Sequence, residues 1–470
     1  GPPARVTPRR RRRCARPPTA PCRARPPPRR RGRRPARRGP ARASRTCTRS
    51  PEEDALAKKK DRYIVGLDVG THKICAIVAE LAEEGRLDVI GIGQAESKGL
   101  RKGVVINLEA TVDAIKRVLE EAELMAGVEI GSAYVGIAGT HIKGFNSRGV
   151  IAVSNKNRVI DKEDVRRVID AAKAVSIPLD REILHVLPQE FVVDDQDGIG
   201  DPSGMTGTRL EVNVHVITCS TTAAQNTVTC VNRAGLEVVD TVLTQIAAAE
   251  ACLTPDEKEL GVAIVDIGGG TTDLAIFEKG SLWHTAVLQV GGEHFTNDVA
   301  VALRTPVGEA EKIKKKHGCA LTSMIPEEDS IEVPSVGGRK PRIMARQVLG
   351  DVLQARAEEI CQLALTEIRR AGFERSLNSG VVLTGGGAIL EGLPEIAEQI
   401  FDMPVRRGTP AGIGGLVDVV ASPVYATAVG LVQCGYRNRA GRALGTSRQA
   451  ATGTFGKVTG RLMGWLSDFF

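Results

Sequence analysis

Two stretches of this sequence combine an aspartate, glycines and hydroxyl side chains in the same order. Asp68 ends an apolar run and is followed by glycine, threonine and lysine, and Asp266 ends a second apolar run before three glycines and two threonines. Glycines let backbone N–H groups approach an anion, threonine and lysine donate to phosphate oxygens, and an aspartate can hold a hydrated Mg²⁺. The candidate phosphate-binding residues are Gly70, Thr71, Lys73, Gly268, Gly269, Gly270, Thr271 and Thr272.

The same chemistry gives the candidate metal-side residues. Asp68 and Asp266 are expected to face the water shell of a metal ion. Asp273 directly follows Thr271 and Thr272, and the sequence leaves open whether it is a further metal-side carboxylate or a turn residue.

The elements that must position these residues are two β-hairpins. Residues 63–81 and 261–280 each read as two β-rich runs joined by a tight polar turn, and they lie 198 residues apart. A pattern that recurs once at this separation implies two related lobes. If the two turns face each other, they would clamp the phosphates of a nucleotide between the lobes.

A third glycine cluster differs in kind, because a buried strand leads through Gly385, Gly386 and Gly387 into an amphipathic helix within residues 379–401. The cluster matches neither the P-loop nor the Rossmann glycine pattern. A glycine cluster can also serve a turn for structural reasons alone.

The ordered set of two Asp-Gly-Thr hairpins and one strand-glycine-helix unit resembles the actin, Hsp70 and sugar-kinase superfamily. Over residues 62–470 the chain is most similar to the FtsA family of bacterial cell-division proteins, on RYIVGLDVGTHKI, GGEHFTNDVA and the hairpin spacing. The resemblance implies an α/β, actin-like two-lobed fold with a duplicated ATPase core, a small inserted α+β subdomain and a C-terminal amphipathic helix.

The resemblance also implies ATP with Mg²⁺ as cofactors, with the third glycine cluster near the adenosine. EAEKIKKKHG is similar to an element that contacts the nucleoside, which would assign Glu311 and Lys314; a solvated charged helix face is the equal alternative. Residues 235–253 look like the first connecting helix, and residues 423–430 like the second. Aligned on the first of these helices, Thr244 takes the position of a water-orienting glutamate, with Gln245 next to it, so we expect slow or negligible hydrolysis.

The predicted domain boundaries follow from these matches. We expect a disordered Arg/Pro-rich tail at 1–61, the first lobe at 62–99, the inserted subdomain at 100–178, the first lobe continued at 179–258, the second lobe at 259–420, the second connecting helix at 421–436, a flexible linker at 437–454 and an amphipathic helix at 455–470.

The net charge of +8 is the sum of unlike segments, since residues 1–50 carry +19, residues 51–435 carry −16 and residues 436–470 carry +5. The first fifty residues cannot form a core and resemble translated GC-rich upstream DNA more than a binding arm. The aromatic share of 3% argues against a stacking surface for single strands. We therefore expect no nucleic-acid partner.

The last sixteen residues form a pattern typical of a helix that lies in a membrane interface. At about 100° per residue, the apolar side chains fall in one arc, with basic side chains on the opposite face. Sixteen residues are too few to span a bilayer. The apolar set is Phe455, Val458, Leu462, Met463, Trp465, Leu466, Phe469 and Phe470, and the basic pair is Lys457 and Arg461.

The resemblance implies a protein that self-assembles, tethers the tubulin-like FtsZ ring to the cytoplasmic face of the cell membrane at the division septum, and recruits later division proteins through its insert. Its partners would be FtsZ, further copies of itself, those later proteins and an anionic membrane surface. Two alternatives remain at this point: an actin-like ATP-binding protein of pilus assembly, and an Hsp70-like or sugar-kinase-like ATPase.

Overall fold

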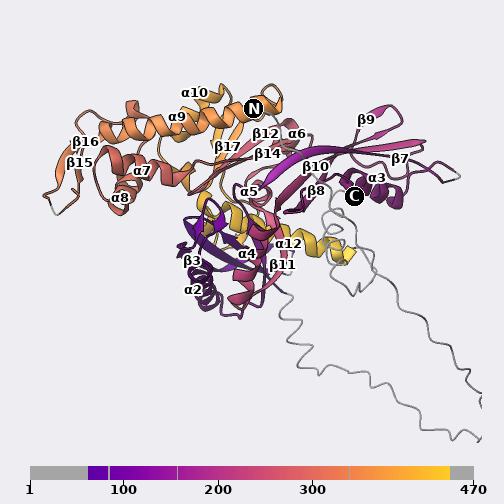
Figure 1. The fold of residues 1–470 in the computed structure, drawn as a ribbon, viewed down its shortest axis with the longest axis horizontal. Helices are drawn as coiled ribbons and strands as arrows, with labels where there is room; N and C mark the ends of the chain where they lie inside the picture. Colours follow the sequence, from indigo (N-terminus) through magenta and orange to yellow (C-terminus); the bar gives the residue numbers. More distant parts are fainter. Residues whose placement is uncertain (1–61, 83–84, 156, 338, 445–470) are drawn as a thin grey trace, which may run out of the picture. The chain divides into compact units, whose positions relative to one another are not determined.

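The computed structural model describes residues 62–444, apart from residues 83–84, 156 and 338 (Figure 1). Two mixed sheets form the cores of the two lobes. The first has the strand order β11-β6-β1-β2-β3-β19, and the second has the order β14-β13-β12-β17-β18. The strands of the first sheet are β1 (Tyr63–Val69), β2 (Lys73–Leu81), β3 (Leu87–Glu96), β6 (Ser132–Ile137), β11 (Glu237–Leu243) and β19 (Gly414–Gly415). Those of the second are β12 (Val262–Ile267), β13 (Thr272–Glu278), β14 (Ser281–Leu288), β17 (Val381–Thr384) and β18 (Val405–Arg407).

Both sheets repeat one topology. In each, three consecutive antiparallel strands are followed by two strands parallel to the first, so β1, β2, β3, β6 and β11 correspond to β12, β13, β14, β17 and β18. The central strands are runs of Val, Ile and Ala buried on both faces, as expected for strands covered by helices on either side. The predicted duplicated core is confirmed, and each predicted hairpin is present.

Helices cover the sheets. In the first lobe these are α2 (Leu108–Ala126) and α4 (Thr221–Arg233), and the short hairpin β4 (Leu100–Arg101) with β5 (Val104–Val105) precedes α2. The second lobe holds α6 (Pro255–Leu260), α7 (Gly292–Ala302), α8 (Val307–His317), α9 (Arg346–Ala371) and α10 (Leu393–Phe401), with the hairpin β15 (Ser330–Val333) and β16 (Arg342–Ala345). Short 3₁₀ turns lie at Thr322–Met324, Gly386–Ile389 and Pro423–Tyr425.

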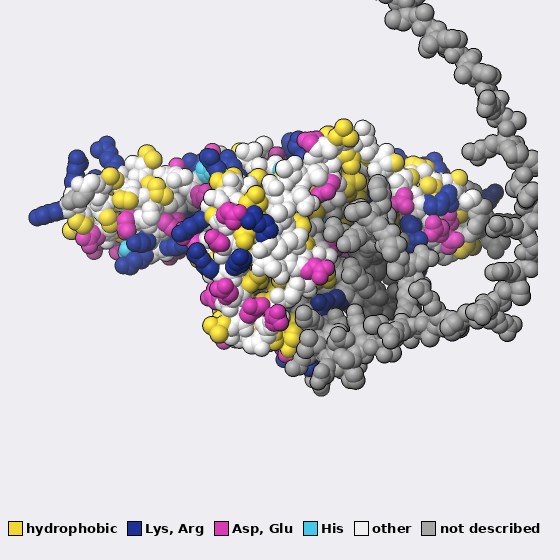
Figure 2. All heavy atoms as spheres, turned by 60° about the horizontal axis from the view of Figure 1, so that its bottom comes forward, with side chains coloured by type: hydrophobic (Ala, Val, Ile, Leu, Met, Phe, Trp, Pro, Cys, Tyr) yellow, Lys and Arg dark blue, Asp and Glu magenta, His cyan; other side chains and the backbone are white. Residues whose placement is uncertain are grey.

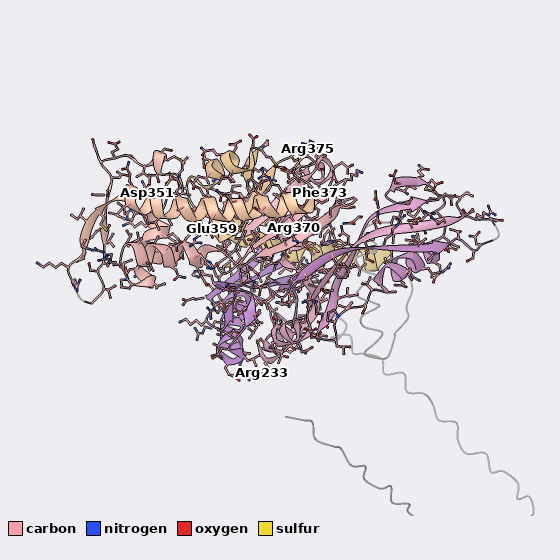
Figure 3. All side chains as sticks on the ribbon, turned by 45° about the horizontal axis from the view of Figure 1, so that its top comes forward. Arg233, Asp351, Glu359, Arg370, Phe373 and Arg375 are labelled. Atoms are coloured by element: carbon pink, nitrogen blue, oxygen red, sulfur yellow. The ribbon has the colours of Figure 1, made fainter. Side chains whose placement is uncertain are left out.

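The long helix α9 packs near its C-terminal end against β14, the edge strand of the second-lobe sheet. Figure 3 shows Asp351, Glu359 and Arg370 along α9, with Phe373 just beyond its end. The ring centroids of Phe373 and Trp283 of β14 are 6.1 Å apart, a distance typical of an aromatic pair. This contact fixes the C-terminal end of α9 against β14.

The inserted subdomain is a separate four-stranded sheet covered by one helix. Its strands are β7 (Lys143–Ala152), β8 (Arg181–Val193), β9 (Gln196–Ile199) and β10 (Arg209–Ser220), in the order β7-β10-β8-β9, and α3 (Lys162–Lys173) packs on β7 and β10. The helix begins with a capping box in which Asp161 accepts from the backbone N–H of Asp164 and the side chain of Asp164 accepts from the N–H of Asp161.

The predicted boundaries of this insert, 100–178, are wrong at both ends. Helix α2 belongs to the first lobe, because its buried face, which includes Ile115 and Val118, packs on β2 and β3. Gly93 of β3 makes this possible, since a Cβ at that position would collide with the carbonyl oxygen of Val118. The strands β8 and β10, assigned by prediction to the first lobe, complete the sheet of the insert.

Two helices connect the lobes, and both differ from their predicted bounds. Within residues 235–253 only α5 (Thr244–Cys252) is helical, because the β-branched run before it pairs as β11 with β6. The second helix, α12, runs from Ala426 to Leu444 and so includes part of the predicted linker. It follows a short helix, α11 (Val417–Val420). The chain also returns to the first lobe earlier than predicted, since β19 already pairs with β3.

The helices α5 and α12 cross at very short range. A Cβ on Gly430 of α12 would overlap the carbonyl oxygen of Ala247 of α5, so the crossing requires glycine there. A small cluster of Val242, Ala247, Leu431 and Cys434 fills the rest of the contact. The connection between the lobes is therefore a tightly packed helix pair.

Candidate functional site

The glycine turns of the two hairpins lie against each other. A Cβ on Gly269 would be 2.7 Å from the Cβ of His72, and a Cβ on Gly270 would be 3.0 Å from the Cγ2 of Thr71. The hydroxyl of Thr71 accepts a hydrogen bond from the backbone N–H of Gly103 at 2.9 Å. The structure thus brings the two predicted phosphate turns together from the two lobes.

Three carboxyl groups lie behind these turns, of which Asp273 is buried and Asp68 and Asp266 are partly buried. Asp266 is the next-to-last residue of β12 and pairs in register with Asp273 of β13, while Asp68 stands at the corresponding place on β1. Burial raises the pKa of all three groups; repulsion from Asp68 contributes to raising the pKa of Asp266 to about 6, and the pKa of Asp273 is raised well above its ordinary value. The carboxylates together form a site of concentrated negative charge that a cation would stabilise.

The geometry of these carboxylates is not that of a closed protein cage for a metal ion. Over the described ranges, no group of three or more His, Cys, Asp or Glu side chains is placed to hold one. One oxygen of Asp273 has no hydrogen-bond partner there, and Asp266 accepts a bond of 3.3 Å from the hydroxyl of Thr427. The donor set suits a hydrated Mg²⁺, which keeps several waters and takes one or two carboxylates along with phosphate oxygens.

Lys73 is held between the hairpin and the 3₁₀ turn Pro423–Tyr425 that precedes α12. Its ammonium group donates to the carbonyl oxygen of Val424 at 2.5 Å and lies 4.5 Å from the centre of the Tyr425 ring. Its positive charge acts to lower the pKa of both Asp68 and Asp266, which places it near the carboxylates. Its role toward phosphate stays a prediction.

The second glycine turn is fixed by the start of α7. The carbonyl oxygens of Gly268 and Gly269 accept the N–H groups of Gly292 and Glu293, both at 2.8 Å, so they satisfy two donors that a helix N-terminus leaves free. The hydroxyl of Thr272 donates to the carbonyl of Val290 at 2.8 Å and therefore already has a partner inside the second lobe. Thr271 is buried beside it.

The third glycine cluster is needed partly for packing. Gly385 has a φ of +82°, and a Cβ there would collide with a carboxylate oxygen of Asp266. A Cβ on Gly387 would overlap the side chain of Ile267. Gly386 has open space around it, so of the three it is the position where a ligand could approach the backbone closely.

Glu311 and Lys314 are joined in one polar network rather than exposed on a solvated face. Their charged groups are 2.6 Å apart, and Lys314 also donates to the hydroxyl of Thr296 at 2.7 Å and to the carbonyl of Gly292 at 3.1 Å. Burial alone would raise the pKa of Glu311, but hydrogen bonds from Lys314 and Thr296 lower it to about 2. The network ties α8 to the start of α7, directly beside the second glycine turn.

Thr244 and Gln245 occupy the first turn of α5, which contacts both sheets. They are 4% and 1% exposed, and the hydroxyl of Thr244 and both amide atoms of Gln245 have no partner among the described residues. Buried polar groups are normally paired, so unpaired atoms at such a place indicate a bound water or ligand. Whether either residue orients water stays a prediction.

Sequence reasoning missed three residues of this site. Thr427 bonds to Asp266, Thr296 joins the Glu311 network, and the ammonium group of Lys102 lies 3.4 Å from the side-chain oxygen of Gln289 in the other lobe. The first two lie in segments that the resemblance had already matched, GGEHFTNDVA and residues 423–430, but no role was assigned to their threonines. The turn that holds Lys102 could have been found, because the glycine that follows it is a typical turn residue between two short apolar runs.

The two facing hairpins, the duplicated sheets and the paired connecting helices define an actin-like nucleotide-binding fold. In agreement, a solved structure titled "PilM-PilN type IV pilus biogenesis complex" is similar with a TM-score of 0.60 at 17% identity, covering 79% of this chain and 98% of that one. Residues 263–430 match the model described as "Cell division protein FtsA", and residues 139–218 match "SHS2 domain inserted in FTSA".

The chain belongs to the FtsA family of cell division proteins. It is 50% identical to the cell division protein FtsA of Pseudomonas aeruginosa over 378 residues, covering 80% of this chain and 90% of the relative. It is 40% identical to FtsA of Escherichia coli over 423 residues, covering 88% of this chain and all of the relative. This confirms the predicted family and actin-like fold, and it favours neither the pilus-assembly nor the ATPase alternative.

Several predictions lie outside the described residues. They concern the tail at 1–61, most of the linker and the whole amphipathic segment at 455–470. Among the residues that the structure does describe, we find no helix with the length and apolarity needed to cross a membrane.

Proposed function

We propose that the chain binds ATP with Mg²⁺ between its lobes and tethers the FtsZ ring to the cytoplasmic face of the membrane at the division septum. Membership of the FtsA family is the observation that carries this proposal. The facing Asp-Gly-Thr hairpins support the claim that the chain binds a nucleotide. The amphipathic pattern of residues 455–470 supports the claim that the chain attaches to a membrane.

The residues present fit a magnesium nucleotide. Asp68, Asp266 and Asp273 would hold the water shell of the ion, and the backbone N–H groups of both glycine turns would hold phosphate oxygens. Gly386 with the Glu311 and Lys314 network would lie toward the adenosine. When bound, Mg²⁺ would neutralise the phosphate charge, and this chain's own contribution would be to orient the nucleotide and join the lobes around it.

We further propose that nucleotide occupancy acts as a switch for self-association. Both turns are joined to elements beyond the site: the first to the β4–β5 turn through Thr71 and Gly103, and the second to α7. Adding phosphates between the turns would therefore act on both lobes at once. The insert would then recruit later division proteins, a role that rests on family resemblance alone.

The contact with FtsZ is proposed for the outer part of the second lobe, between residues 294 and 368. This region comprises α7, α8, the β15–β16 hairpin and most of α9. Lys and Arg side chains project at the end of the molecule that carries this hairpin (Figure 2), where the sequence holds Arg339, Lys340 and Arg342. A basic tip of this kind suits an acidic peptide segment.

The proposed tethering is tested by measuring whether the chain recruits FtsZ to vesicles. Labelled FtsZ polymers are mixed with anionic vesicles, ATP and Mg²⁺, with or without the full chain, and vesicle-bound FtsZ is measured by flotation. We expect FtsZ on vesicles only when the chain is present. If the chain floats with the vesicles but leaves FtsZ in solution, the tethering proposal is wrong while membrane binding stands.

Gln245 gives a prediction about turnover. We expect phosphate release far below the ~10 s⁻¹ typical of enzymes, because neither Thr244 nor Gln245 is a strong base. Gln245→Ala should lower the residual rate severalfold with nucleotide affinity unchanged, because only water orientation is lost, and Gln362→Ala on the exposed face of α9 is the control that should change neither. Phosphate release and nucleotide titration measure the two effects. Turnover at the rate of a sugar kinase, or an unchanged rate in Gln245→Ala, would contradict these assignments.

A further inference from the structure

A cavity lies at the opposite end of strands β12 and β13 from the glycine turns. Its volume is about 640 Å³, within the range typical of ligand sites. It is formed where α5, α6 and α12 meet the β13–β14 turn and strand β8 of the insert. The large apolar side chains that line it are Leu187, Ile246, Leu253, Phe277 and Leu282.

Polar atoms in this cavity lack partners. Asn438 is 2% exposed, and its side-chain nitrogen has no hydrogen-bond partner among the described residues. The side-chain oxygen of Gln433 is likewise unpaired there, although its nitrogen donates to the carbonyl of Ala411 at 2.6 Å. A buried donor and a buried acceptor left unpaired in an apolar cavity indicate that something else binds there.

The rim of the cavity carries charge. Glu250 pairs with Lys258 at 3.3 Å and also with Arg437, and the ammonium group of Lys258 lies 5.6 Å from the centre of the Phe277 ring. Glu259 is exposed at the rim and forms no ion pair within the described ranges. The site therefore suits an occupant with an apolar face and hydrogen-bonding groups, and Glu259 offers a partner for a basic side chain of that occupant.

The chain itself carries such an occupant close by. Four of the lining residues come from α12, and the last described residue, Leu444, is six positions beyond Asn438, or about 9 Å along a helix. The ten residues 445–454 can reach about 33 Å when extended, which is ample to return to the cavity. Residues 455–470 then offer aromatic and aliphatic side chains, the indole N–H of Trp465, and two basic residues, Lys457 and Arg461.

We propose that the cavity lined by α5, α6 and α12 binds the apolar face of the chain's own C-terminal segment, residues 455–470, when that segment is not in a membrane. This inference rests on the proposed membrane role of the segment, because the same apolar face would enter the bilayer. Docking and membrane insertion exclude each other. The cavity thus lowers the fraction of chains that are ready to bind lipid and keeps the aromatic side chains out of water.

The docking is tested by photo-crosslinking in the full chain. Trp465 is replaced by p-benzoylphenylalanine, the protein is irradiated, and the cross-linked residues are identified by mass spectrometry. We expect cross-links within one chain to cavity residues such as Ile246 and Phe277, and their loss when vesicles of phosphatidylglycerol and phosphatidylethanolamine are added. Cross-links outside the cavity, or between chains in a mixture of isotopically light and heavy protein, would overturn the proposal.

A variant that fills the mouth of the cavity gives an independent measurement. Gln433→Trp places a ring at the rim from an accessible position of α12, and Gln362→Trp on the exposed face of α9 is the matched control. We expect Gln433→Trp to remove the cross-links and to raise vesicle affinity about threefold, because the binding-competent fraction rises. Gln362→Trp should change neither. Unchanged cross-links and affinity in Gln433→Trp would count against docking.

The two proposals can fail separately. A synthetic peptide of residues 455–470 is titrated with the same vesicles. If the peptide does not bind them, the membrane role is wrong, and the cross-links measured without vesicles still decide whether the segment docks. If the peptide binds but Trp465 never cross-links to the cavity, only the docking proposal falls.

Discussion

A chain that ends at Leu444 is expected to lose binding to anionic vesicles while keeping its nucleotide affinity. The apolar side chains of residues 455–470 supply most of the membrane affinity, each at most about 1.5 to 3 kcal/mol, whereas a basic residue near anionic lipid contributes about 1 kcal/mol. The chain is ended at Leu444 because a cut after Tyr436 would remove the last eight residues of α12. Co-sedimentation with vesicles measures the loss.

Two variants of the full chain separate the apolar from the electrostatic contribution to vesicle binding. Trp465→Ala should weaken vesicle binding at least tenfold at any salt concentration, because it removes buried apolar surface. Lys457→Gln with Arg461→Gln should weaken it less, and that loss should disappear at high salt, because the lipid charge is then screened. Vesicle binding by the chain that ends at Leu444, equal to that of the full chain, would remove the membrane role from the C-terminal segment.

Asp266→Asn is expected to act in opposite directions on ligand binding and on stability. Affinity for the magnesium nucleotide should fall at least tenfold, because a carboxylate facing the ion is lost. The nucleotide-free protein should become more stable at pH 7.5, because an ionised carboxylate beside Asp68 and Asp273 is removed from the interior. Nucleotide titration and thermal unfolding measure the two effects, and Asp113→Asn on the exposed face of α2 is the control.

The pH dependence has a definite sign. The pKa of Asp266 is raised to about 6, chiefly by burial, so the folded chain holds this proton more tightly than the unfolded chain. The resulting stabilisation is fully present below about pH 4 and is lost as the pH rises through 6, amounting to about 3 kcal/mol. The nucleotide-free parent should therefore lose stability across this range, and Asp266→Asn should lose less. Parallel curves for the two proteins would contradict the raised pKa.

The local sequence predicted the hairpins of the site well. Each is specified by neighbouring residues: β-branched runs that form strands, a turn that needs glycine, and a polar residue at the strand end. The same reasoning failed for residues 235–253, where EVVDTVL forms β11. A short apolar run fits either a strand or a buried helix, and only the free edge of β6 in the parallel sheet selects the strand.

The predicted boundaries of the insert were wrong for a related reason. Helix α2 and helix α3 are both amphipathic, and nothing in their own residues says which sheet each one covers. Two glycines determine which sheet each helix covers. Gly93 of β3 leaves room for the backbone of α2, and Gly149 of β7 leaves room for the backbone of α3. Such pairings join positions that are distant in the sequence, so they depend on packing and not on local propensity.

By itself, then, the sequence determined the family, the duplicated hairpins and the positions of Asp68, Asp266 and Asp273, because these follow from residue types at fixed local spacing. Only the tertiary structure decided that the three carboxyl groups lie together, that Thr427 and Lys73 stand beside them, and that Asn438 and Gln433 face a cavity at the opposite end of β12 and β13. Burial, charge repulsion and unpaired hydrogen-bonding groups are properties of neighbours in space, which the order of residues along the chain does not contain.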